Sequence, residues 1–154
     1  MSRVADLYAR VSARLAHRPG SALATRLHAS LVRRTGGRIG GRALGAEVLV
    51  LSTVGRRSGK HRDAPLFFVP YEQGFAVLAA NAASARPPAW WLNLQQHPDA
   101  QALVRGHTYS VRARAASEPE TADLWPRLAE NYSGIEHYRS IARRELPVVV
   151  LEPR

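Results

Sequence analysis

Two short motifs in this sequence combine residue types that suit an anion and a planar ring. The first is the run Gly55-Arg56-Arg57-Ser58-Gly59-Lys60, which Arg62 follows closely. Its glycines let the backbone turn and present N–H groups, and its arginines and lysine add positive charge. The second is Pro88-Ala89-Trp90-Trp91-Leu92-Asn93, which offers aromatic surface and an amide. Together the motifs predict a site for an anionic cofactor that carries a ring.

Each motif also has a plainer structural explanation. The glycine-rich run is typical of a solvated hairpin turn, and it is not a Walker A loop because Val54 stands where that motif requires glycine. Tryptophans usually pack in the core. Helical spacing favours one of Trp90 and Trp91 facing inward and the other facing a cleft. The amide of Asn93, in a short apolar helix, would need backbone groups or a ligand as partners.

Other residue types that carry catalysis show no recognisable arrangement. The six histidines form neither a His-x-x-x-His nor a His-Glu-x-x-His pattern, so no metal site is predicted. The absence of cysteine excludes a thiolate ligand and a cysteine nucleophile. No serine lies in a Gly-x-Ser-x-Gly elbow, so a hydrolase is not supported. These absences favour chemistry that is carried by a bound cofactor.

Positive charge is concentrated in the first part of the chain. The sequence has 154 residues and a formal net charge of +10. Residues 1–62 hold thirteen arginines and lysines against two acidic residues, whereas residues 63–154 hold nine arginines against ten acidic residues. A basic segment of this kind attracts phosphates, acidic lipid or nucleic acid.

No apolar run approaches the roughly 20 residues of a membrane span, and the start of the sequence lacks the apolar core of a signal peptide. We therefore expect a cytoplasmic protein. Residues 1–45 are expected to be a basic helical extension, because residues 3–16 and 21–34 have helical spacing and a glycine-rich connector follows. These helices would either cap the core or lie on the anionic inner face of the membrane.

Residues 46–154 are expected to be the cofactor-binding domain, and strand patterns dominate them. Strands are predicted over residues 47–53, 65–71, 75–80, 100–105, 107–115 and 146–151. Helices are predicted over residues 88–96 and over residues 135–143. A third helix is predicted to begin after a capping box that Ser117 and Glu120 form. Strands in hairpins without regular helical crossovers predict a mainly β fold (α+β), an antiparallel barrel with added helices.

Both motifs resemble the deazaflavin-dependent nitroreductase and quinone reductase family. The resemblance rests on Leu51–Arg62, Pro65–Phe67, Pro88–Leu94 and the C-terminal run Pro147–Pro153. It implies a split β-barrel of the flavin- and deazaflavin-binding oxidoreductase type. The implied cofactor is coenzyme F(420), an 8-hydroxy-5-deazaflavin with a phosphate and an acidic oligoglutamate tail. Such proteins pass a hydride from the reduced deazaflavin to quinones, nitroaromatics or other activated acceptors.

The resemblance also implies roles for individual residues. Arg56, Arg57, Ser58 and Arg62 would hold the phosphate and tail, within a loop that also contains Gly55, Gly59 and Lys60. Ala80, Asn81, Ala89, Trp90, Trp91 and Asn93 would line the deazaflavin, with Pro65, Phe67 and Arg86 as further cofactor-binding candidates. Tyr132 or Tyr138 would donate a hydrogen bond or proton to the acceptor oxygen. Alternatively, both tyrosines pack the C-terminal helices onto the barrel.

The sequence departs from the family pattern in two places. Many relatives have two glycines near the ring, where this chain has Ala82 and Ala83. The nitroimidazole-reducing relatives have three tyrosines spaced by three, where this chain has Tyr132, Ile135 and Tyr138. The second departure disfavours nitroimidazole reduction and leaves quinone reduction open.

Other functions stay open on the sequence alone. An FMN-dependent oxidoreductase on the same barrel is one, although a single phosphate needs fewer cations than the loop supplies. A deazaflavin carrier without turnover is another. A nucleic-acid-binding module would fit the basic segment, but no recognisable nucleic-acid motif is present and no such partner is predicted. The expected partner is a small quinone or nitro compound, with peripheral membrane contact and a dimer as open alternatives.

Overall fold

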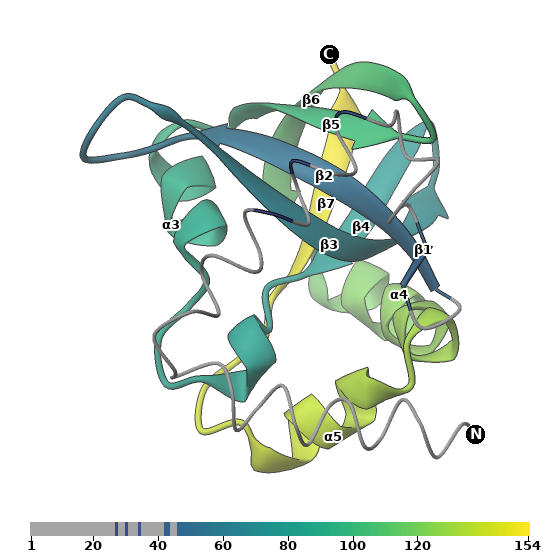
Figure 1. Cartoon of the computed structure of the whole chain (residues 1–154). Helices are drawn as coiled ribbons and strands as arrows, with labels where there is room; N and C mark the ends of the chain where they lie inside the picture. Colours follow the sequence, from purple (N-terminus) through teal and green to yellow (C-terminus); the bar gives the residue numbers. More distant parts are fainter. Residues whose placement is uncertain (1–26, 28–29, 31–33, 35–41, 44–45) are drawn as a thin grey trace.

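A computed structural model of the chain describes Leu27, Ser30 and Arg34, and residues 42–43 and 46–154 (Figure 1). The helix expected over residues 3–16 lies outside the described residues, as does most of the helix expected over residues 21–34. Leu27, Ser30 and Arg34, which belong to the second of these, are helical and exposed. Leu27 is 61% exposed, so the apolar stripe does not pack on the barrel at this position.

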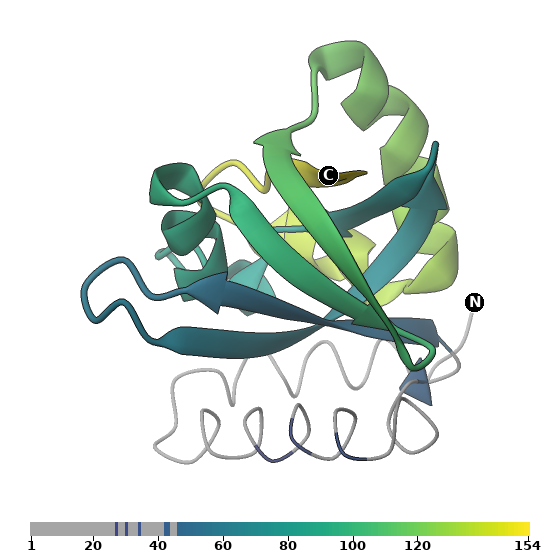
Figure 2. The ribbon, with the colours of Figure 1, turned by 90° about the horizontal axis from the view of Figure 1, so that it is seen from above.

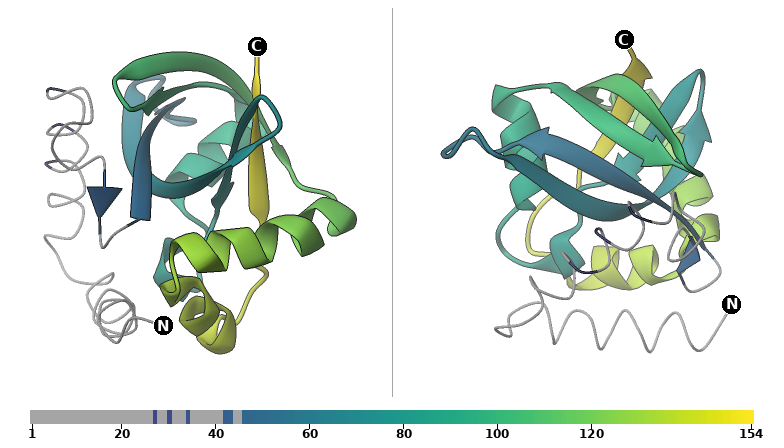
Figure 3. Two further views of the ribbon diagram at one scale, coloured as in Figure 1. Left: turned by 90° about the vertical axis from the view of Figure 1, so that its right-hand side faces the viewer. Right: turned by 45° about the horizontal axis from the view of Figure 1, so that its top comes forward.

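Six strands close into an antiparallel barrel, as the sequence predicts. Their order is β2 (Ala46–Val54), β3 (His61–Tyr71), β4 (Gly74–Leu78), β7 (Val148–Pro153), β6 (His107–Ala115) and β5 (Asp99–Val104). The barrel closes because β5 also pairs with β2, with Val50 opposite Leu103. A short strand, β1 (Arg42–Ala43), pairs with the start of β2. The left view of Figure 3 shows the strands curving around the interior.

Two tight turns set the register of the predicted hairpins. Tyr71 pairs with Gly74 across one turn, in which Glu72 has a φ of 50°. Val104 pairs with His107 across the other, where Arg105 and Gly106 have φ values of 47° and 84°. Positive φ in a two-residue turn matches the right-handed twist of the flanking strands. Both hairpins are therefore confirmed.

The first core fills the barrel interior. Helix α3 (Ala89–Gln96), which follows Pro88 as predicted, contributes Trp90, Trp91 and Leu94 to the same cluster as Leu49, Phe68 and Leu151. Trp90 and Trp91 are only 8% and 9% exposed, and their rings meet edge to face. The prediction that one tryptophan faces a cleft is wrong, because both side chains are buried in the same core.

The second core lies between the barrel wall and the C-terminal helices. Strand residues alternate between faces, so Val69, Val148 and Val150 point away from the first core. Helices α4 (Glu118–Asn131) and α5 (Gly134–Ile141) cover these residues (Figure 2). Their buried side chains are Leu124, Leu128, Ile135 and Tyr138, with Tyr132 between the helices.

Helix α4 begins with the predicted capping box. The Ser117 hydroxyl accepts a hydrogen bond from the Glu120 amide, and the Glu120 carboxylate accepts one from the Ser117 amide at 2.7 Å. Each bond satisfies a donor that the start of a helix would otherwise leave unpaired. Within the described part of the chain, no helix is long and apolar enough to cross a membrane.

Candidate functional site

The first motif forms the loop between β2 and β3, which projects from the barrel in Figure 1. The Gly55 amide donates to the Lys60 carbonyl at 2.8 Å, and the Ser58 and Gly59 amides both donate to the Gly55 carbonyl. A Cβ on Gly55 would lie 2.9 Å from the Ser58 Oγ, and Gly59 has a φ of +65°. Glycine is therefore favoured at both positions of this tight closure. The expectation of amides free for an anion is wrong for Gly55, Ser58 and Gly59, because the loop itself uses them.

Positive side chains are concentrated in this loop. Arg57, Lys60 and Arg62 are exposed, and Arg56 is half-buried. None of the four forms a salt bridge with a carboxylate of the described residues. By contrast, Arg105 pairs with Glu47, and Arg112, Arg114, Arg127 and Arg154 also have carboxylate partners. The loop is thus a concentration of uncompensated charge that suits a polyanion.

Asn93 links the two motifs. Its Nδ2 donates to the Thr53 Oγ1 at 3.1 Å, and its Oδ1 accepts from the Arg56 amide and from the Arg56 Nη1, each at 3.2 Å. Asn93 is 3% exposed and Thr53 is fully buried. The partners of the Asn93 amide are therefore residues of the chain itself. This network fixes the cationic loop against α3, a connection that spacing in the sequence does not reveal.

Polar side chains also fasten the strands at the base of the loop. The Ser52 hydroxyl donates to the Asp63 carboxylate, and Ser52 and Asp63 are paired residues of β2 and β3. The Arg62 guanidinium approaches the Ser58 Oγ at 3.5 Å. The loop therefore emerges from a rigid base, while Arg57 and Lys60 extend into solvent.

The segment expected beside the ring forms an unusual turn. Asn81–Ala83 is a short 3-10 segment, η1, in which Asn81, Ala82 and Ala83 have φ values of 47°, 49° and 57°. The Asn81 Nδ2 donates to the Arg86 carbonyl at 2.9 Å, which joins two of the predicted cofactor-binding residues. Non-glycine residues rarely adopt this left-handed conformation. Glycine at positions 82 and 83 would adopt it without strain.

The predicted catalytic tyrosines lie together in the second core. The Tyr132 ring stacks on Phe67 with 4.3 Å between ring centroids, and the Tyr132 and Tyr138 hydroxyls are 3.5 Å apart. The two residues are 2% and 8% exposed. Ala80 belongs to the same cluster, and Ala82 and Ala83 pack against it. The tyrosines are thus close to the η1 turn, although their burial also fits the packing explanation.

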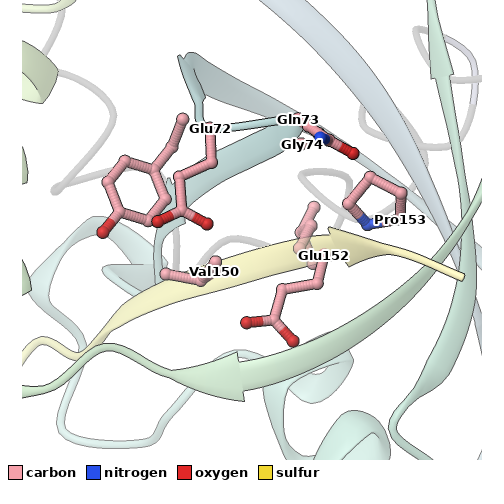
Figure 4. A pocket seen from close by; sticks show the side chains of 8 residues that line it. Glu72, Gln73, Gly74, Val150, Glu152 and Pro153 are labelled. Carbon is pink, nitrogen blue, oxygen red and sulfur yellow. The ribbon is translucent and has the colours of Figure 1, made fainter.

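A separate pocket, outside the cationic loop, is lined by acidic side chains. It has a volume of about 450 Å³ and lies between the β3–β4 turn and β7, where Glu72 and Glu152 line it (Figure 4). The backbone approaches closely here, since a Cβ on Gly74 would lie 2.0 Å from the Leu151 carbonyl oxygen. The carboxylates make this pocket unsuitable for a polyanion. In the described ranges, no group of three or more metal-ligating side chains occurs.

Comparison with known proteins identifies the family. The family model of the F(420)H(2)-dependent quinone reductases matches residues 24–153. The chain belongs to this family. The match begins within the segment that the sequence predicts to be an extension, so the boundary at residue 45 stays a prediction.

Curated relatives support the assignment. The chain is 33% identical over 133 residues to the F(420)H(2)-dependent quinone reductase Rv1261c of Mycobacterium tuberculosis. The match covers 84% of the chain and 89% of the relative. It is 35% identical over 106 residues to Rv3178 of the same species, which is provisionally named an F(420)H(2)-dependent quinone reductase. That match covers 69% of the chain and 89% of the relative. Family members are oxidoreductases by name.

Solved structures confirm the split-barrel fold. An F(420)-H(2)-dependent reductase, FDR-A, superposes with a TM-score of 0.63 at 24% identity, covering 68% of this chain and 93% of its own. A protein described as a domain-swapped dimer superposes with a TM-score of 0.66 at 23% identity, covering 82% of this chain and 96% of its own. At these identities the likeness shows the fold alone.

The structure fits a bound coenzyme F(420) in one respect and differs from expectation in another. The uncompensated cations of Arg57, Lys60 and Arg62 suit a phosphate and an acidic tail. The amides of Gly55, Ser58 and Gly59 are already bonded within the loop, so they do not contribute as expected. Sequence reasoning assigned no role to Thr53 or Arg144, whose side chains bond to Asn93 and to the Ala80 carbonyl. Thr53 lies within the run Leu51–Arg62 and Arg144 lies in no recognised motif, so only their contacts reveal them.

Proposed function

We propose that this protein catalyses hydride transfer from reduced coenzyme F(420) to a quinone. The observation that carries the proposal is the cationic β2–β3 loop, whose side chains form no salt bridges with described carboxylates and which Asn93 fixes against α3. Family membership and the names of the relatives support coenzyme F(420) as the donor and a quinone as the acceptor.

The residues divide into those that bind the cofactor and those that position the binders. Arg57, Lys60 and Arg62 would bind the phosphate and acidic tail through side-chain charge. Arg56 is turned toward Asn93, so it shapes the loop as well as adding charge. Ala80, Asn81 and Ala89 would contact the ring, while the buried Trp90 and Trp91 would support that wall from behind. The bound deazaflavin would supply a two-electron hydride, and the protein would hold the acceptor in near-attack geometry.

A tyrosine would supply the proton. Tyr132 and Tyr138 have hydroxyls within 3.5 Å of one another, beside the cluster that includes Ala80. We expect Tyr132→Phe combined with Tyr138→Phe to lower kcat by about 10²-fold or more, because general-acid catalysis contributes about 10²–10⁴. Tyr109→Phe, at an exposed tyrosine of β6, is the matched control. Unchanged turnover in the double variant would mean that solvent supplies the proton.

Cofactor titration tests the whole proposal. Oxidised coenzyme F(420) and FMN would each be added to the purified protein while tryptophan fluorescence is followed, and turnover would be measured with reduced F(420) and menadione. We expect the wild-type protein to bind F(420) more tightly than FMN. We expect Arg57→Ala and Lys60→Ala to bind F(420) about 10-fold more weakly and with less dependence on salt, because each removes a cation from the tail site. Arg105→Ala, an exposed cation already paired with Glu47, is the control.

The outcomes separate the alternatives. Binding of FMN alone would make the protein an FMN-dependent oxidoreductase on the same barrel. Tight F(420) binding without reduction of menadione or a nitroaromatic compound would make it a carrier. Reduction of nitroaromatic compounds in preference to quinones would change the acceptor class. Binding of neither cofactor would contradict the proposal and leave the fold.

A further inference from the structure

Arg144 makes an unusual set of contacts just before β7. Its Nε donates to the Ser84 carbonyl at 2.9 Å, its Nη1 to the Ala79 carbonyl at 3.1 Å and its Nη2 to the Ala80 carbonyl at 2.6 Å. Its Nη1 also reaches the Glu145 carbonyl at 2.8 Å. Among the described residues, no carboxylate forms a salt bridge with this guanidinium. Backbone carbonyls alone therefore surround the charge.

These contacts bracket the η1 turn. Ala79 and Ala80 precede the three left-handed residues and Ser84 follows them. Each non-glycine residue in this conformation costs roughly 1–2 kcal/mol relative to right-handed backbone. Within the turn, the Ala83 amide donates to the Ala80 carbonyl at 3.0 Å and the Ser84 amide to the Asn81 carbonyl at 2.9 Å. Two bonds of this kind contribute only about 0.5–1.5 kcal/mol each. The turn therefore needs support from outside itself.

The guanidinium is well suited to give that support. Its planar fork carries five donors, so one side chain reaches carbonyls on both sides of the turn at once. Burial lowers the pKa of Arg144 from its ordinary value, yet arginine stays protonated at any physiological pH. A lysine has one compact ammonium group and cannot bridge the same positions. Its neighbour Arg143 is exposed and offers a matched control.

We propose that Arg144 is a positioning residue that holds the Ala79–Ser84 turn in its left-handed conformation and thereby shapes the wall against which the cofactor ring binds. The second half of this inference rests on the proposed function, since Ala80 and Asn81 are the residues proposed to contact the ring. The same turn packs Ala82 and Ala83 against the cluster that contains Tyr138. Arg144 therefore links the ring wall to the tyrosines.

Amide hydrogen exchange without cofactor tests the first half. In Arg144→Met we expect the Ala83 and Ser84 amides to exchange at least about 10-fold faster, because the carbonyls that close the turn lose their common partner. The Val149 and Val150 amides of β7 report whether the barrel stays folded. Arg143→Met should leave every amide unchanged. Unchanged protection of Ala83 and Ser84 in Arg144→Met would overturn the proposal, and so would full protection in Arg144→Lys.

Glycine substitution keeps the test valid if Arg144→Met folds poorly. Ala82→Gly combined with Ala83→Gly removes the penalty of left-handed backbone. We expect this pair to restore folding, and part of the turn's order, in the Arg144→Met background. No recovery would mean that strain in the turn is not what Arg144 opposes.

Cofactor measurements test the second half. We expect Arg144→Met to weaken binding of oxidised F(420) about 10-fold and to lower kcat with menadione by up to about 100-fold, since a small displacement of reacting groups has effects of that size. Normal cofactor affinity and kcat, despite faster exchange of the turn, would overturn the link to the ring wall. If the wild-type protein binds no F(420), the proposed function fails while the exchange result still decides the role of Arg144 in the turn.

Discussion

At the scale of single residues, Asn93 has the most consequential contacts. It is buried inside α3, and its side chain bonds to Thr53 at the end of β2 and to Arg56 in the first motif. Truncating it would remove one of two partners of the buried Thr53 hydroxyl and the acceptor of the half-buried Arg56 amide. A lost buried partner costs about 1–3 kcal/mol.

We expect Asn93→Ala to lower the free energy of unfolding by about 1–3 kcal/mol and to weaken F(420) binding, because the cationic loop is no longer fixed to α3. Denaturant unfolding and tryptophan quenching would measure the two effects. Gln95→Ala, at an exposed position of the same helix, is the control and should change neither. Unchanged cofactor affinity in a destabilised Asn93→Ala would show that the link is structural only.

At the scale of elements, α4 is attached to the barrel by a carboxylate. The Glu120 side chain accepts two hydrogen bonds from Arg114 of β6, at 2.6 and 2.7 Å, and one from the Tyr71 hydroxyl of β3 at 3.2 Å. The Arg114 guanidinium, followed by the Ser117 amide, holds the pKa of Glu120 well below its ordinary value of 4.5. Arg114 also pairs with Glu152 of β7. One charge network therefore joins α4 to three strands.

The sign of the pH dependence follows from that depressed pKa. The ionised carboxylate is favoured in the folded state, so its contribution is fully present above pH 4.5 and is lost as the pH falls below that value. We expect Glu120→Gln to lower thermal stability at neutral pH and to flatten its decline in acid. Glu130→Gln, at an exposed position of α4, should keep the wild-type profile. A wild-type acid decline in Glu120→Gln would mean that other carboxylates dominate it.

At the scale of the whole molecule, positive charge is divided between two places. The β2–β3 loop carries the cations proposed to bind the cofactor, and the N-terminal segment carries most of the remaining excess. Leu27 is 61% exposed and Arg34 is also exposed, so apolar and basic side chains are both available on this segment. We propose peripheral contact with an anionic membrane, where quinones are also concentrated.

Vesicle binding by the full chain measures this contact. Residues 1–23 hold four arginines against one aspartate and precede the residues that the family model matches. Each basic residue near an anionic surface contributes about 1 kcal/mol, so deleting residues 1–23 should weaken binding to vesicles containing phosphatidylserine by about 10-fold or more. Neutral vesicles and added salt are the controls. Equal binding by both proteins would mean that residues 1–23 do not take part in the contact. The affinity for F(420) should be the same in both.

Much of this architecture could be predicted from the sequence because it depends on local signals. Alternating apolar residues predicted β6, a continuous apolar run predicted β7, and turn residues predicted both hairpins. The Ser117 and Glu120 capping box fixed the start of α4. The cationic loop and the aromatic helix were both predicted to be parts of one site, and a hydrogen bond from Arg56 to Asn93 connects them.

Only the tertiary structure decided how those parts are held. Spacing along α3 predicted different surroundings for Trp90 and Trp91, but the barrel end that α3 covers buries both. The amides of the glycine-rich loop were expected to be free, but closing the loop uses those of Gly55, Ser58 and Gly59. Arg144 lies 60 residues or more from the carbonyls of Ser84 and Ala80, so no local pattern connects them. Sequence fixes short-range geometry and charge, whereas long-range hydrogen bonds exist only once the barrel has closed.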